Sequence, residues 1–187
     1  MTRSVQFRYD TLTPLQDIAL HEAAHAVIGW RCGLPIDYVT IVPEPGEYDG
    51  IVWWQCRMRA PVSFPIGQDL NPFAPWTREY WGAQLYMAAA PHGLPFHAFG
   101  TSTCLSDSDW EVIEKARQHV PIDEDKLFCN MDRLVQTELE TIFVVARSLM
   151  RHKQLTGHQV GRIIGRVDRD SVAPHRTYHA LRGNDSG

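Results

Sequence analysis

The sequence predicts a single, mainly α-helical domain with one small β-hairpin. First, apolar residues make up 44% and charged residues 21% of the 187 residues, which is ordinary for a globular domain. Second, much of the chain shows helix-start signals followed by apolar residues at helical spacing. Third, two short neighbouring segments are rich in β-branched and aromatic residues, and a turn-forming stretch separates them.

The first helix is expected from Thr13 to about Arg31. Thr13 suits the N-cap, because its hydroxyl can accept a backbone hydrogen bond, and Pro14 suits the first helical position. Gln16 completes a capping box with Thr13. Gly33 is placed to end the helix, since glycine readily adopts the left-handed conformation that often follows a helix.

A hairpin is expected directly after this helix. Residues 38–42 and 51–57 predict its two strands, and the Pro- and Gly-containing residues 43–50 predict the turn between them. Residues 58–75 contain four prolines and predict a loop. The hairpin is the only good candidate for a sheet in the chain.

The remainder of the chain is mostly helical by the same criteria. Pro91 ends the second helix, and Ser106 or Ser108 caps the third. Thr156 and Gln159 form another capping box, which opens the last helix. The expected helices span residues 76–90, 106–120, 123–153 (with at most one break) and 156–167.

These elements define one domain over residues 13–167. Residues 1–12 are expected to form an N-terminal tail, and residues 168–187 a flexible C-terminal tail. The sequence shows no internal repeat, so a repeat architecture is not expected.

Composition and charge argue against several partners and compartments. The net charge is −4 and no stretch is rich in Lys and Arg, so no nucleic-acid partner is expected. Residues 80–106 carry no charged side chain, but Pro91 and Pro95 interrupt them, so they do not predict a membrane span. The four cysteines form no CxxC pair, and the N-terminus lacks the apolar core of a signal peptide. We therefore expect a cytoplasmic protein with reduced thiols.

The segment His21-Glu22-Ala23-Ala24-His25 carries the strongest chemical signal. Residues four apart lie on one face of a helix, so His21 and His25 can direct imidazole nitrogens at one metal ion. Glu22 follows the first of these ligands and can take a proton from a water molecule at the metal. This HExxH pattern indicates a zinc hydrolase, with Glu22 as the general base.

The simplest alternative is a pair of ordinary half-buried histidines on an amphipathic helix. The position of the motif inside a well-capped helix favours the metal site. The metzincin pattern is excluded, because Ile28 and Arg31 stand where it requires Gly and His. Glu44 and Glu47 lie in the predicted turn and not on a second helix, so the third ligand must come from farther along the chain.

Several segments resemble the peptidase domain of the FtsH-type AAA proteases, in the same order. The resemblance spans roughly residues 13–167 and begins with the HEAAH helix and the following strand VTIVP, which precedes a Gly-containing second strand. Three further segments resemble later helices of that domain, and these are WTREYWGAQLYMAAA, TSTCLSDSDWEVIEKAR and TIFVVARSLMRHKQLTGHQV. The resemblance implies a zincin-type, mainly helical metallopeptidase domain that binds Zn²⁺.

The third metal ligand is expected at the start of the third helix. In the FtsH-type pattern an Asp at such a helix start supplies this ligand, and an apolar residue follows it. Asp109, followed by Trp110, matches that pattern better than Asp107. A helix N-terminus favours the ionised carboxylate, which is the form that coordinates a metal. The alternative is that Asp109 only completes a capping box with Ser106, while Asp107 or His92 binds the metal.

We therefore expect a zinc endopeptidase with Glu22 as catalytic base and with His21, His25 and Asp109 as metal ligands. The chain holds no GxxxxGKS or GxxxxGKT motif, so the expected activity does not use ATP, and the substrates are flexible segments or one dedicated partner protein. The resemblance also implies a homo-oligomer or an external ATPase partner. The rival hypotheses are a zinc hydrolase acting on a non-protein amide and a non-catalytic binding module.

Overall fold

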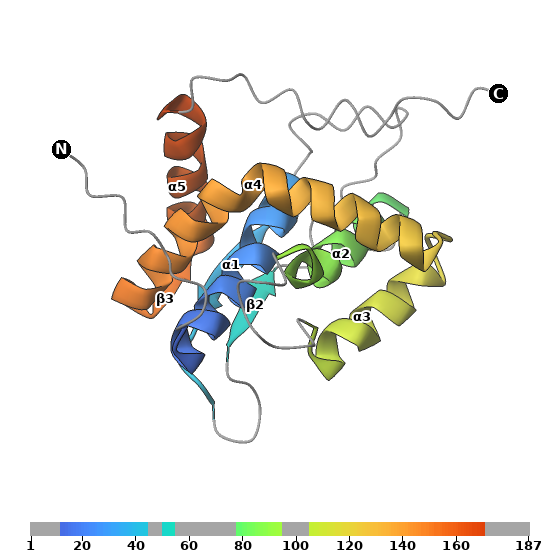
Figure 1. Cartoon of the computed structure of the whole chain (residues 1–187), viewed down its shortest axis with the longest axis horizontal. Helices are drawn as coiled ribbons and strands as arrows, with labels where there is room; N and C mark the ends of the chain where they lie inside the picture. The colour runs from blue at the N-terminus through green and yellow to red at the C-terminus, as the bar shows by residue number, and fades with distance from the viewer. Residues whose placement is uncertain (1–11, 45–49, 55–77, 95–104, 171–187) are drawn as a thin grey trace.

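A computed structural model of the chain describes residues 12–44, 50–54, 78–94 and 105–170 (Figure 1). It is mainly helical with a small antiparallel sheet, which confirms the predicted class. The elements in chain order are α1 (Pro14–Arg31), β1 (Ile36–Thr40), β2 (Ile51–Trp54), α2 (Arg78–Ala89), the 3₁₀ helix η2 (Ala90–Gly93), α3 (Asp107–Arg117), α4 (Glu124–His152), β3 (Gln154–Thr156) and α5 (Gly157–Asp170).

Helix α1 is the centre of the fold. It packs against α4, α2, α5 and the sheet, and α4 runs diagonally across it in Figure 1. Its N-terminus has the predicted capping box, in which the Thr13 backbone N–H donates to Gln16 Oε1 at 2.8 Å. Almost every residue from Ala19 to Gly29 is buried, which is why the helix is so rich in alanine and aliphatic side chains.

The sheet has three strands, one more than predicted. The strand order is β2-β1-β3, and both pairings are antiparallel. Strand β1 begins at Ile36 and ends at Thr40, two residues earlier at each end than the predicted 38–42. Strand β2 starts at the predicted Ile51, and residues 55–57 of its predicted range lie outside the described part of the chain.

The C-terminal half forms a helical hairpin joined by β3. Helix α4 is continuous over 29 residues, so the break allowed for in residues 123–153 does not occur. It ends at His152, and the following C-cap residue, Lys153, has a left-handed φ of 66°. The chain then forms β3 and enters α5. Helix α5 continues to Asp170, three residues beyond the expected end. The predicted capping box is present, with the Thr156 N–H donating to Gln159 Oε1.

Three other predictions fall on residues that the structure does not describe. These are the N-terminal tail up to residue 11, the Pro-rich loop over residues 58–75 and the C-terminal tail from residue 171. Within the described ranges, no helix combines the length and the apolar character that crossing a membrane requires.

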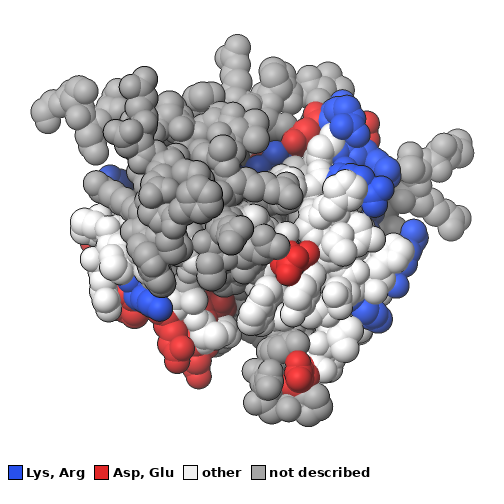
Figure 2. Space-filling model, turned by 180° about the vertical axis from the view of Figure 1, so that it is seen from behind, with Lys and Arg blue, Asp and Glu red and all other residues white. Residues whose placement is uncertain are grey.

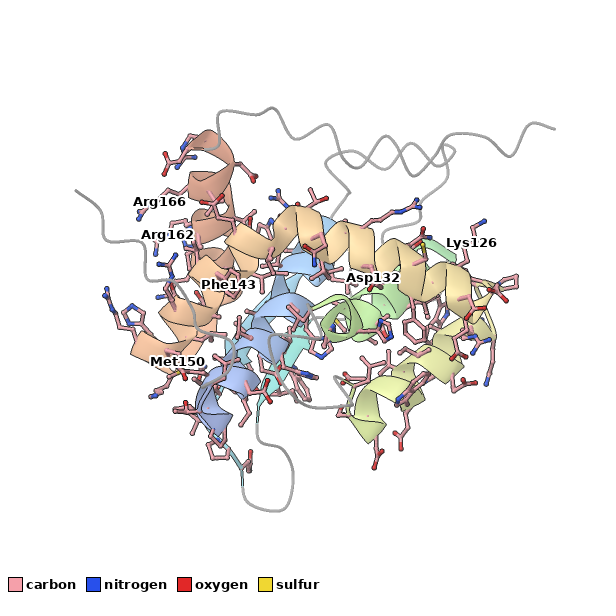
Figure 3. All side chains as sticks on the ribbon, in the orientation of Figure 1. Lys126, Asp132, Phe143, Met150, Arg162 and Arg166 are labelled. Carbon is pink, nitrogen blue, oxygen red and sulfur yellow. The ribbon has the colours of Figure 1, made fainter. Side chains whose placement is uncertain are left out.

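The described surface is uneven in charge. Lys and Arg side chains gather toward the right margin of Figure 2, where α5 and the end of α4 lie. Arg162 and Arg166 project outward from α5 in Figure 3. Asp and Glu side chains gather at the lower left of Figure 2, near α3 and the start of α4.

Candidate metal centre

Two elements far apart in the sequence bring the candidate ligands together. His21 and His25 lie one turn apart on α1, and Asp109 is in the first turn of α3. The Nε2 atoms of the two histidines are 3.0 Å apart. Asp109 places Oδ2 at 3.3 Å from His21 Nε2 and Oδ1 at 3.1 Å from His25 Nε2.

These three side chains form a group that can hold a metal ion. The donor atoms of a tetrahedral site with metal–ligand bonds of about 2.0–2.1 Å are roughly 3.3 Å apart. The three distances between the donor atoms, 3.0, 3.1 and 3.3 Å, are close to that separation. One ion would therefore reach all three side chains with only small movements.

The alternative third ligands lie elsewhere. Asp107 is exposed on the first turn of α3 and does not belong to the group. His92, in η2, stacks on Phe128 with ring centroids 4.0 Å apart, and its Nδ1 lies 3.8 Å from Asp132, a residue labelled on α4 in Figure 3. Of the three candidates weighed, only Asp109 meets the two histidines.

A backbone carbonyl sets the orientation of His25. His25 Nδ1 lies 2.8 Å from the Met87 carbonyl oxygen of α2, and the contact is buried. Because a carbonyl can only accept, Nδ1 must carry the proton and donate. The lone pair of the neutral ring is then on Nε2, the atom that faces Asp109 and His21. Metal-binding histidines generally have such a partner on the other ring nitrogen.

The N-terminus of α3 holds the Asp109 carboxylate in place. Ser106, the N-cap, donates both its backbone N–H (2.8 Å) and its hydroxyl (2.7 Å) to Asp109 Oδ2. Burial raises the pKa of Asp109, but the neighbouring His25 and His21 imidazoles outweigh it and hold that pKa well below its usual range. The carboxylate is therefore ionised at neutral pH and available as a ligand.

Glu22 is buried beside this group, with only 6% of its surface exposed. Burial raises the pKa of its carboxyl to about 7, and the negative charge of Asp109 adds to this, while the neighbouring His21 opposes it. A carboxyl group with a pKa near neutrality can both accept and return a proton at physiological pH. The arrangement thus places a carboxyl group that can exchange protons beside a group of three side chains that can hold a metal ion.

Sequence reasoning missed two features of the site, and both belong to the main chain. The Met87 carbonyl was not anticipated, because every residue has a carbonyl group and none is marked by its side chain. The close approach of Gly50 to Glu22 was also missed. The sequence predicts only a turn at Gly50, and the absence of a side chain at this position is the one signal of a close approach.

Comparisons with known proteins add no family assignment. No protein-family model matches the chain. No curated protein matches it either. The resemblance to the FtsH-type peptidase domain therefore depends only on the sequence motifs themselves.

Proposed function

We propose that this protein is a zinc-dependent endopeptidase. The observation that carries the proposal is the convergence of His21, His25 and Asp109, with the buried Glu22 beside them on the same helix. Two imidazole nitrogens and one carboxylate oxygen are a donor set that zinc accepts readily. Three protein ligands leave a fourth position for water or substrate, which is the pattern of catalytic zinc sites.

In this proposal each residue has a separate task. His21, His25 and Asp109 hold the ion, and the Met87 carbonyl keeps the His25 ring in its coordinating tautomer. Zinc would supply Lewis acidity towards water and towards the carbonyl group of the substrate. Glu22 takes the proton of the attacking water and delivers it to the leaving amine.

The proposed substrate is an extended peptide segment. Strand β2 is at one edge of the described sheet, and Gly50, the residue before it, packs against Glu22. A sheet edge offers hydrogen-bonding partners to the backbone of an extended peptide. Because the chain has no ATP-binding motif, we further propose that it cleaves flexible segments or one dedicated partner protein, alone, as a homo-oligomer or with a separate ATPase.

Substitution of Glu22 by Gln tests this function. Gln has nearly the same shape but cannot act as a base, so we expect a folded protein that keeps about one zinc ion per chain. Cleavage of fluorescein-labelled casein should fall by at least ~10²–10⁴-fold, as for a lost general base. Glu111→Gln, at an exposed position on α3, is the matched control and should cleave at the wild-type rate.

Metal analysis of the same samples separates the proposal from a simpler arrangement. A proton shared between two imidazoles and a carboxylate would satisfy similar distances without any metal. Protein purified without chelator should contain zinc, and His21→Ala should lose it. A wild-type protein that neither contains nor takes up zinc, or a Glu22→Gln variant with full activity, would rule out the proposed function.

A further inference from the structure

Gly50 packs unusually closely against α1. A Cβ atom at position 50 would lie 2.7 Å from Glu22 Cγ, 2.9 Å from Glu22 Oε1 and 2.8 Å from Ile18 Cγ2. Optimal carbon–carbon contacts are about 3.5–4.0 Å, so even a methyl group does not fit there without movement. The space that a side chain would fill is therefore the space that Glu22 occupies.

The backbone conformation does not explain the glycine. The φ of Gly50 does not lie in the left-handed region, whereas that of Gly33 does, at 84°. Alanine could therefore adopt the backbone conformation of Gly50 without the strain of a left-handed residue. What excludes alanine is the contact with Glu22 and Ile18.

The clash would be relieved mainly by Glu22. The next residue along, Ile51, pairs with Thr40 of β1, which holds the start of β2 in place. Ile18 packs against the hydrophobic core, which restricts its movement. Glu22 is the more flexible of the two side chains in contact, because it is long and unbranched whereas Ile18 is β-branched, and both its Cγ and its Oε1 would have to move. None of the metal-binding side chains is among the three atoms nearest to the added Cβ.

We propose that Gly50 is a positioning residue for Glu22. By having no side chain, it leaves the pocket in which the Glu22 carboxylate is held beside the metal-binding group. This inference rests on the proposed role of Glu22 as the base. It adds that Gly50, the residue immediately before β2, determines where that base lies.

Substitution of Gly50 by Ala tests the inference. We expect the variant to fold and to keep the wild-type zinc content, while kcat for fluorescein-labelled casein falls by about 10–100-fold, because a misplacement of about 1 Å can cost that much. KM should stay within about twofold, since the group that moves acts on the proton and not on peptide binding. A crystal structure of the variant should show the Glu22 carboxylate displaced.

Two further variants serve as controls. Gly82→Ala places the same methyl group on α2 at a position with nothing within 4 Å, and its kcat should be unchanged. Ile18→Ala combined with Gly50→Ala removes one of the atoms in the clash. Gly50→Ala should therefore lower kcat by a smaller factor when it is introduced into Ile18→Ala than when it is introduced into the wild-type protein.

The outcomes separate this inference from the proposed function. If wild type cleaves casein and Gly50→Ala is equally fast, or its crystal structure shows Glu22 unmoved, the inference is wrong and the proposed function stands. Loss of zinc together with activity would also overturn it, because Gly50 would then support the metal-binding group itself. If the wild-type protein binds no zinc and cleaves nothing, the proposed function fails. The position of Glu22 in the crystal structure of Gly50→Ala then still shows whether Gly50 determines where this side chain lies.

Discussion

Two of the three side chains of the candidate site, His25 and Asp109, are oriented by a contact outside the site. The Met87 carbonyl holds His25, and the Ser106 N–H and hydroxyl hold the Asp109 carboxylate. His21 is on the same helix as His25. The two rings are in edge-to-face contact, with their centroids 4.6 Å apart. Side chains fixed in this way lose little further freedom on binding an ion, which favours tight binding.

Asp109 and Asp107 are predicted to differ sharply in their importance for metal binding. Asp109→Asn keeps an oxygen for Ser106 but removes the ionised ligand, so we expect zinc affinity to fall by at least about 100-fold, beyond the usual cost of a lost outer-shell partner. Asp107→Asn, two residues away on the exposed first turn of α3, should change it by less than about threefold. Competition with a chromophoric chelator measures both affinities, and the opposite ranking would overturn the assignment of the ligand.

The sequence predicts which three side chains come together, because two histidines at helical spacing and an Asp at a helix start are recognisable from residue type and position. The sequence left Asp107 and His92 open as third ligands, since spacing along a chain does not show which helix start faces α1. In the structure Asp109, at 9% exposure, lies next to the two histidines, whereas Asp107 is exposed and lies outside the group. The contacts made by the backbone of Met87 and Gly50 could not be predicted from the sequence, because they depend on how helices and strands pack.

At the scale of elements, the helices were predictable and the sheet only in part. Capping boxes at Thr13 and Thr156 signal helix starts locally, and both are present. Strand β3 has only three residues, too few for an alternating pattern, and it is formed by pairing with β1. Val42 has a strand-like side chain but is 50% exposed beyond the end of β1, so propensity alone placed that boundary too late.

The edge strand β2 provides a test of substrate binding. Successive N–H groups of a strand point alternately towards and away from a neighbouring strand, so Ile51→Pro and Val52→Pro remove donors on opposite sides. The variant that loses a bond to β1 should be destabilised. The other should fold, keep its zinc and show a KM for casein about tenfold higher, which corresponds to the loss of roughly one hydrogen bond. Unchanged KM in both variants would argue against docking by strand addition.

A partly buried ion-pair network joins the end of α1 to α4 and α5. Arg31 donates two hydrogen bonds to Asp168, at 2.6 and 2.8 Å, and one to Glu138 at 2.9 Å. Glu138 is only 1% exposed, so its charge depends on a partner within the protein. Asp168 is on the last turn of α5, beyond Val167, where the sequence predicts the helix to end.

Removing Arg31 is therefore expected to destabilise the fold. Arg31→Met should lower the free energy of unfolding by about 3–5 kcal/mol, as for a buried charge left without its partner. Arg117→Met breaks two surface ion pairs, with Glu114 and Glu124, and should cost less than about 1 kcal/mol. Urea titration followed by circular dichroism measures both, and Arg31→Met/Glu138→Met should recover much of the loss. If Arg31→Met and Arg117→Met lowered the free energy of unfolding equally, the burial of the Arg31 network would not increase its contribution to stability.

At the scale of the whole molecule, the site joins two parts of the chain that have few other direct contacts. Helix α3 packs mainly against α2, whereas α1 packs against α4, α2 and the sheet. The ligands on α1 and α3 therefore form a direct bridge between them. An ion held by His21, His25 and Asp109 would strengthen this bridge, so metal binding and the stability of the folded chain are expected to be coupled.

Metal removal should accordingly lower the thermal stability of the whole domain. A ligand that binds only the folded state at 100 times its Kd contributes about 2.7 kcal/mol, and 1 kcal/mol shifts the Tm of a domain of this size by about 2–4 °C. Chelation should therefore lower the Tm by roughly 5–10 °C, measured by circular dichroism with and without chelator. Glu22→Gln, which keeps all three ligands, should show the same decrease, whereas His25→Ala should start at the lower Tm and not respond. A chelator response that persists in His25→Ala would place the stabilising metal elsewhere in the chain.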